Sequence, residues 1–359
     1  MTQQNLIPKS LSFPAAPPSM FEKMTYDGLE DAQQPQALFS LEQIGNPTPE
    51  VFMPRGKVGI IGGFGGTGKS LAIMHFALSL VTNKETLMRG PDSEALIPNS
   101  KSFKVALVYG EEDHLTCKWR LKQALKKLKL WSQYKTILDQ LIIIPLADKG
   151  DISLVDDNDY EEGESPADKR FDDLYNTLNE YAGDSGLDLV CLDPLSHFGG
   201  PDFETDNGQA VRLMRRLGEL TKLKGNPTVL GIHHSPKGAK NNRLDDALRG
   251  SSALKDNSRW VGIIRRVNED SEGVNCLETS QGFPVIELIV AKANYSRSGM
   301  RVRFALDKGV ITAIEGDDEK LLNPANTVLP PKANKPRSNN SSTNQAQRGS
   351  NNVSKPPIR

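Results

Sequence analysis

The chain has 359 residues, enough for one large domain or two small ones. Its 44 Lys and Arg and 45 Asp and Glu residues leave a formal net charge of −1, so only a local basic cluster could bind nucleic acid. Three scattered cysteines exclude a disulfide framework, and no apolar run approaches the roughly 18 residues that span a bilayer, so we expect a cytoplasmic protein with no membrane partner.

Residues 1–36 form the first segment. They are rich in Pro, Gln and Ser and contain few apolar side chains, a composition that predicts a mobile N-terminal arm. Such an arm can dock on a neighbouring subunit, and a plain disordered tail is the alternative. Residues 37–44 are expected to lead into the first strand.

A glycine-rich loop follows the predicted strand over 58–61. The stretch GGFGGTGKS (62–70) fits the pattern G-x-x-x-x-G-K-[ST] at every fixed position and predicts a phosphate-binding loop. Glycines let backbone N–H groups approach a polyphosphate, and a helix over 71–80 would point its positive end at the anion. A simple turn is the alternative. The residues predicted to bind the nucleotide are Gly63, Gly65, Gly66, Thr67, Gly68, Lys69 and Ser70.

Strand and helix patterns alternate from residue 50 to 235. Apolar runs predict buried strands at 104–109, 141–145, 187–193 and 227–234, and helical spacing predicts helices over 114–131, 171–181 and 209–224. In the helix over 114–131, the lysines are predicted on a solvated side, and the residues predicted on the apolar side are Leu115, Trp119, Leu121, Leu125 and Leu128. The strands predicted towards the C-terminus lie at 260–264, 285–291, 302–306 and 310–314, the last ones antiparallel.

These elements predict an α/β fold with a mainly parallel twisted sheet, helices on both faces and antiparallel C-terminal strands, over residues 37–317. Ligands of such sheets bind at the carboxyl ends of the strands. The acidic stretch 148–168 is interpreted as a solvated insertion, with a metal site as the less favoured alternative. Residues 318–359 are predicted to be a disordered basic tail.

Carboxylates end two of the predicted strands. Asp193 closes the run LDLVCLD and is predicted to hold Mg²⁺ together with Ser70; a turn residue is the alternative. Three acidic residues, Glu111 to Asp113, close the strand that follows the phosphate loop, and one of them could polarise the attacking water. Because side chains alternate along a strand, we choose Glu112. The alternative is an acidic cap on the next helix.

Two histidines, His233 and His234, end the predicted strand over 227–234. One of them could sense the γ phosphate of ATP and pass its state to the following loop, and a purely structural role is equally favoured.

Six segments in chain order resemble the RecA-like hexameric ATPases of the AAA-family P-loop proteins, and within them the RepA-type replicative helicases of plasmids. The segments are GGFGGTGKS, VYGEED, LDPLSHF, GIHHSPKG, RGSSALKDNSRW and AKANY. The resemblance covers residues 37–315, and it implies a ring in which each ATP lies between two subunits. The residues that it assigns to the subunit's own nucleotide are Lys69, Ser70, Glu112, Asp193 and His234.

The resemblance also implies contacts to a neighbouring subunit and to DNA. Arg259 would act on the neighbour's ATP as an arginine finger, which can be worth about 10³ to 10⁵ in rate, and Lys292 is a further candidate at this junction. Two loops, 199–208 and 237–249, would face the centre of the ring. The first is acidic, so contact with single-stranded DNA is assigned to the second. The candidate DNA-binding residues are Lys237, Lys240 and Arg243.

The sequence therefore predicts an ATP- and Mg²⁺-dependent ring motor, a helicase or translocase in the replication of a plasmid or another mobile element. Replication-initiation proteins are candidate partners. One alternative is a regulatory or repair ATPase that does not unwind DNA, and another is a nucleotide-gated DNA clamp. The same nucleotide-binding residues would serve all three functions.

Overall fold

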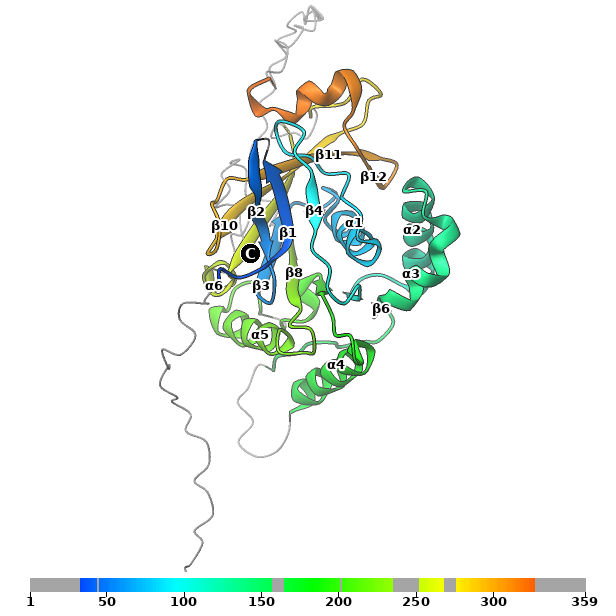
Figure 1. Cartoon of the computed structure of the whole chain (residues 1–359). Coiled ribbons are helices and arrows are strands. Elements are labelled where there is room, and N and C mark those ends of the chain that lie inside the picture. The colour runs from blue at the N-terminus through cyan, green and yellow to red at the C-terminus, as the bar shows by residue number, and fades with distance from the viewer. Residues whose placement is uncertain are drawn as a thin grey trace, which may run out of the picture.

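The computed structural model describes residues 33–43, 45–156, 165–200, 202–234, 252–267 and 276–326. A nine-stranded sheet forms the centre of the molecule (Figure 1), in the order β12-β11-β10-β9-β3-β8-β7-β5-β6. Its strands are β3 (Val58–Gly63), β5 (Val105–Tyr109), β6 (Leu141–Pro145), β7 (Leu189–Asp193), β8 (Thr228–His234), β9 (Trp260–Arg266), β10 (Val285–Ala293), β11 (Arg301–Asp307) and β12 (Val310–Thr312).

The sheet is parallel from β6 through β3 to β9, and the pairs β9–β10, β10–β11 and β11–β12 are antiparallel. Helices cover both faces. They are α1 (Lys69–Thr82), α2 (His114–Lys127), α3 (Tyr134–Gln140), α4 (Pro166–Ala182), α5 (Asn207–Leu220) and the short α6 (Ser252–Asn257). The predicted α/β class, with its parallel sheet and antiparallel C-terminal strands, is confirmed.

Successive side chains of a strand point to opposite faces of the sheet, and they form two cores, one on each face. In β5, Val105 and Leu107 pack into the core beneath α1, α2 and α3, whereas Ala106 and Val108 pack into the core beneath α4 and α5. Because both faces are covered, β5 reads as a continuous apolar run in the sequence.

The helix predicted over 114–131 is too long, and its predicted apolar side is right for Leu121 and Leu125 but wrong for Leu115 and Trp119. α2 ends at Lys127, a 3-10 helix spans Trp131–Gln133, and α3 follows. The side chains that pack inward from α2 are Cys117, Leu121 and Leu125, spaced by four. Leu115 and Trp119 are 78% and 53% exposed because the same helical period places them on the opposite side.

A second, three-stranded sheet has the order β2-β1-β4, with β1 (Ala37–Gln43), β2 (Asn46–Pro54) and β4 (Leu96–Pro98). The segment 37–44 therefore contains a strand of its own, where the sequence predicts only a lead-in. The prolines of β2 argue against a central strand, and β2 lies at the sheet edge, where a missing N–H is tolerated. Phe39 of β1 packs against Phe76 of α1, with ring centroids 4.8 Å apart.

Folded structure continues past residue 318, where the sequence predicts a tail. A 3-10 helix spans Gly316–Leu322, and Leu321 and Leu322 are buried against β10 and β11. Residues 1–32, 157–164 and 327–359 lie outside the described residues. They include most of the predicted arm and tail and the middle of the acidic insertion. No helix in the described part of the chain has the length and hydropathy needed to cross a bilayer.

A buried ion pair fastens the small sheet to the large one. Asp188, just before β7, is fully buried, and its carboxylate lies 2.6 Å from Nη1 of Arg55, which follows β2. The same carboxylate accepts hydrogen bonds from the backbone N–H groups of Lys101, Ser102 and Phe103. The pair therefore holds together three segments at the amino ends of the parallel strands.

Asp188→Ala is expected to lower the free energy of unfolding by about 3–5 kcal/mol, because it leaves a buried guanidinium without its partner. Urea denaturation would measure the change. The matched control is Asp184→Ala, since Asp184 is solvent-exposed and forms a surface ion pair with the exposed Lys224. The control should keep the wild-type midpoint, and equal midpoints for the two variants would contradict the stabilising role of the buried pair.

Candidate functional site

The phosphate loop lies at the carboxyl end of β3, the strand between β8 and β9, and leads directly into α1. Two of its glycines are required by the backbone. A Cβ atom at Gly63 would lie 2.3 Å from the carbonyl oxygen of Ile264, and Gly68, the N-cap of α1, has a left-handed φ of +85°. The N-terminus of α1 therefore opens onto this loop, as an anion site needs.

Lys69, the first residue of α1, is buried at 4% exposure. Its Nζ atom donates hydrogen bonds of 2.8 Å to the carbonyl oxygens of Gly63 and Phe64. Burial lowers the pKa of Lys69 to about 8, and the negative charges of Asp193 and Glu111 oppose that shift. The amine thus sits over the loop, in surroundings where an anion would favour its charged form.

Asp193 is the last residue of β7. Among the charged groups that act on Lys69, it has the largest effect on the pKa of that lysine. Asp193 is 5% exposed, and its Oδ2 atom has no hydrogen-bond partner among the described residues. Burial raises its pKa to about 6, and a hydrogen bond from the Ser70 hydroxyl and the charge of Lys69 oppose the shift. The residue pair predicted to hold Mg²⁺ is therefore brought together.

Ser70 and Asp193 suit a magnesium ion whose other ligands are water molecules and phosphate oxygens. An unpaired carboxylate oxygen beside a hydroxyl is the kind of protein contribution that Mg²⁺ takes in nucleotide sites. Within the described ranges there is no group of three or more His, Cys, Asp or Glu side chains that could hold a metal by themselves. Ser70 and Asp193 thus fit Mg²⁺ bound with a nucleotide.

The two glutamates after β5 differ in their surroundings. Glu112, the residue chosen from the sequence, lies 2.5 Å from Nη1 of Arg120 in an ion pair. The charge of Glu111 raises the pKa values of Lys69 and Asp193, and its effect on Asp193 exceeds that of Glu112. Electrostatic coupling therefore favours Glu111 as the carboxylate that acts on the phosphate site.

Asp113 takes the capping role that the sequence left open for this acidic run. Its side chain accepts a 2.7 Å hydrogen bond from the N–H of Thr116 at the start of α2, and this bond lowers its pKa. Glu111 lies 3.2 Å from Nε2 of His197. Capping and nucleotide chemistry are thus assigned to different members of the run.

The two histidines at the end of β8 point to different surroundings. His234 is half-buried, lines the cavity beside Lys69, and has a pKa lowered by burial and by the charge of Lys69. His233 is 1% exposed, its ring centroid lies 6.2 Å from that of Phe203 in an edge-on contact, and neither ring nitrogen has a hydrogen-bond partner in the part of the chain that the structure describes. His234 is the member of the pair that could meet a bound nucleotide.

A cavity of about 540 Å³ extends from the phosphate loop towards the β11–β12 turn. Lys69, Ser70 and His234 line its polar end. The sequence predicted no site role for the other side chains of its wall, which are of two kinds. The basic residues are Arg120, Arg266 and Lys308, and the apolar residues are Leu71, Trp119, Pro284 and Leu306.

Arg259 and Lys292 lie away from the chain's own phosphate loop. The N–H of Arg259 donates a 2.9 Å hydrogen bond to the carbonyl of Val58, at the amino end of β3, and the loop is at the other end. Nζ of Lys292 donates to the carbonyl oxygens of Lys255 and Asp256, at the end of α6. Lys237, Lys240 and Arg243 lie outside the described residues.

Residues 25–240 match a family model described as AAA domain, which is more than half of the chain. The chain belongs to the AAA domain family. A solved structure of a DnaB-like replicative helicase with its primase interactions is 15% identical over 73% of this chain and 59% of that chain, with a TM-score of 0.49. The RadB recombinase is 14% identical over 73% of this chain and 92% of that chain, with a TM-score of 0.45. No curated protein gives a match.

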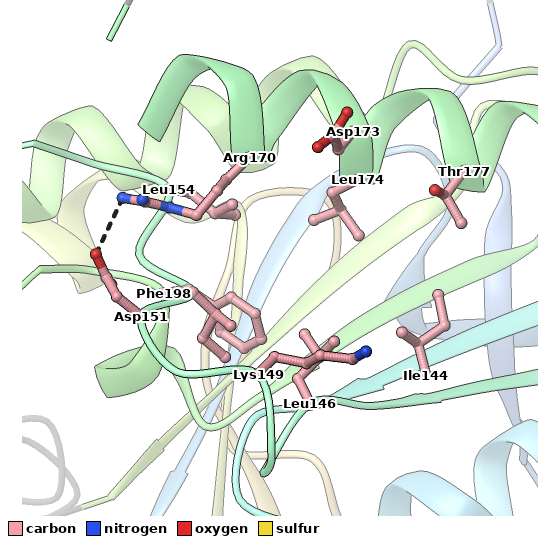
Figure 2. A pocket seen from close by; sticks show the side chains of 11 residues that line it. Ile144, Leu146, Lys149, Asp151, Leu154, Arg170, Asp173, Leu174, Thr177 and Phe198 are labelled. Atoms are coloured by element: carbon pink, nitrogen blue, oxygen red, sulfur yellow. Dashed lines mark ion pairs between the residues drawn. The ribbon is translucent and has the colours of Figure 1, made fainter. Parts of the chain in front are cut away.

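This AAA domain has a second cavity, of about 330 Å³, between the end of β6 and α4 (Figure 2). Its walls include Leu154, Leu174 and Phe198, and Figure 2 shows Arg170 and Asp151 pointing toward each other at 3.3 Å on one side. It shares no lining residue with the phosphate-loop cavity. The first cavity combines the phosphate loop with Lys69 and His234, whose pKa values are both lowered by burial.

Proposed function

We propose that this AAA domain is an ATP-hydrolysing motor. The observation that carries the proposal is that Lys69 and Ser70 of the phosphate loop line one cavity, while the buried carboxylate of Asp193 is hydrogen-bonded to Ser70 behind them. Lys69 would neutralise the β and γ phosphates, while Glu111 or Glu112 would orient the attacking water and His234 would contact the γ phosphate. Mg²⁺, bound by Ser70 and Asp193, would supply further positive charge against the phosphates.

The far wall of the cavity supports a nucleoside as the remainder of the ligand. Trp119 is a half-exposed indole that lines this wall, and the apolar side chains of Pro284 and Leu306 line the same cavity. An aromatic face attracts a nucleobase by stacking. ATP is the nucleotide we favour, since the chain lacks the guanine-reading N-K-x-D motif of GTPases in the expected place.

We further propose that the chain works as a homo-oligomeric ring, most simply a hexamer. Arg259 is exposed at the sheet edge opposite to its own phosphate loop, a position that supports action on the ATP of a neighbouring subunit. Lys292 lies close to it, because Lys292 of β10 pairs with Val261 of β9, two residues after Arg259. The substrate of the motor would be single-stranded DNA during replication of a plasmid or another mobile element.

ATP turnover measured with and without single-stranded DNA, beside the mass in solution, tests the proposal. We expect a ring-sized mass and a turnover that DNA stimulates. Turnover that DNA leaves unchanged would favour a regulatory or repair ATPase without unwinding activity, or a clamp in which hydrolysis times release. Absence of turnover by the wild-type protein under both conditions would contradict the ATPase assignment.

A further inference from the structure

The helical hairpin of α2 and α3 carries an unusual concentration of positive charge. Residues 114–140 contain seven Lys or Arg residues and a single acidic residue, Asp139, in a chain whose formal net charge is −1. Figure 1 shows α2 and α3 side by side at one flank of the molecule. The hairpin is therefore a local basic cluster of the kind that a nearly neutral protein needs in order to bind a polyanion.

The exposed side of α2 is a continuous stripe. Its members are all exposed to solvent and follow the helical spacing i, i+3, i+4, i+7 and i+11. They are Leu115, Lys118, Trp119, Lys122 and Lys126. Residues at this spacing lie on one face of a helix. The stripe therefore presents three lysines and two large apolar side chains together, with Trp119 at the end that lines the nucleotide cavity.

Aromatic rings continue this surface beyond the end of α2. Trp131 is 45% exposed, and its ring stacks on that of Tyr134, with centroids 5.2 Å apart and an interplanar angle of 18°. Nζ of Lys126 lies 5.9 Å from the centroid of the Trp131 ring. A stacked, half-exposed indole with an ammonium group beside it provides a π surface and a positive charge at the same place.

No acidic side chain among the described residues pairs with the lysines of the stripe. Lys127 pairs with Asp307 at 2.9 Å, but Lys118, Lys122 and Lys126 make no ion pair with any described residue. Like charges four residues apart on a helix repel each other, so the stripe destabilises α2 slightly when nothing is bound. A bound polyanion would remove that repulsion.

We propose that the α2–α3 face, defined as Lys118, Lys122, Lys126, Trp131 and Tyr134, binds single-stranded DNA. Lysines attract phosphates of any nucleic acid, but stacking on Trp131 needs unpaired bases, so the aromatic part selects single strands over duplexes. The face is separate from the loop at 237–249 that the sequence assigns to DNA. Through Trp119 it adjoins the nucleotide cavity, so bound DNA would lie next to the ATP site.

Fluorescence anisotropy of a labelled oligo(dT), titrated with the full-length protein at several salt concentrations, tests this proposal. Trp131→Ala is expected to weaken binding by roughly 5- to 100-fold, and Trp131→Phe should restore most of the affinity. The pair Lys122→Gln and Lys126→Gln should reduce the slope of log affinity against log salt by about 1.4, since each lost phosphate contact removes about 0.7. The matched control is Lys169→Gln with Lys222→Gln, two exposed lysines elsewhere.

Three results would overturn the proposal. They are absence of oligo(dT) binding by the wild-type protein, equal affinity and salt slope for the face variants and the control, and a change in the mass of DNA-free protein caused by the face variants. The last result would make the face a contact between subunits. ATP turnover without DNA should be unchanged in all these variants, because none of them alters the phosphate site, so failure here is distinguishable from failure of the ATPase proposal.

Discussion

Lys69→Ala is expected to lower the rate of ATP hydrolysis by at least about 10² to 10³-fold, the usual loss when one preorganised group that stabilises transition-state charge is removed. Lys69 is held over the loop by two 2.8 Å hydrogen bonds to backbone carbonyls. The side chain therefore already lies at the phosphate loop and does not have to move in from solvent when a nucleotide binds. Truncation removes the positive charge from the buried end of the cavity, where screening by water is weakest.

Steady-state phosphate release measures this loss, and circular dichroism checks that the variant is folded. Lys84→Ala is the matched control, because Lys84 lies just past the other end of α1 and is exposed. The control should hydrolyse ATP at the wild-type rate. Hydrolysis retained by Lys69→Ala would remove the phosphate-loop assignment, and with it the main support for an ATPase.

The phosphate loop could be predicted from the sequence because its constraints are local. Gly63 and Gly68 are required by close backbone approach and by a left-handed φ, and both conditions follow from a strand that turns directly into a helix. The buried strands could be predicted for the same reason, since strands covered on both faces have continuous apolar runs. Local rules therefore identified the centre of the sheet and one end of the cavity.

The other end of the cavity could not be predicted, because it depends on which side of α2 packs inward. The stripe with Leu115 and Trp119 and the stripe with Cys117, Leu121 and Leu125 have the same helical period, and both contain apolar residues. The position of β5 decides between them, and position in the sheet is not a local property. The lysines that alternate with Trp119 are the signal that could have identified the exposed stripe.

Contacts between segments that are distant in the sequence could not be predicted either. Arg55 and Asp188 are 133 residues apart, and neither residue has a local signature of its buried partner. The small sheet was missed because β2 contains three prolines, which argue against a strand unless its position at an edge is known. These misses come from tertiary context that overrides local propensity.

The choice between Glu111 and Glu112 leads to the second large effect that we expect. Glu111→Gln should lower ATP turnover by about 10² to 10⁴-fold while nucleotide binding is retained, as for the loss of a general base. Glu112→Gln should lower it much less, because the Glu112 carboxylate is held by Arg120 at 2.5 Å and is already committed to that ion pair. The two variants are isosteric and adjacent, so each serves as the control of the other.

Phosphate release and equilibrium binding of a fluorescent ATP analogue would be measured for both variants. If Glu112→Gln shows the larger loss, the strand-alternation argument that selects Glu112 is correct, and the ion pair with Arg120 must open when nucleotide binds. If Glu111→Gln shows it, the stronger coupling of Glu111 to Asp193 identifies the base. In that case Glu112 would instead position Arg120, whose guanidinium lines the same cavity, and the pair would link α2 to the nucleotide site.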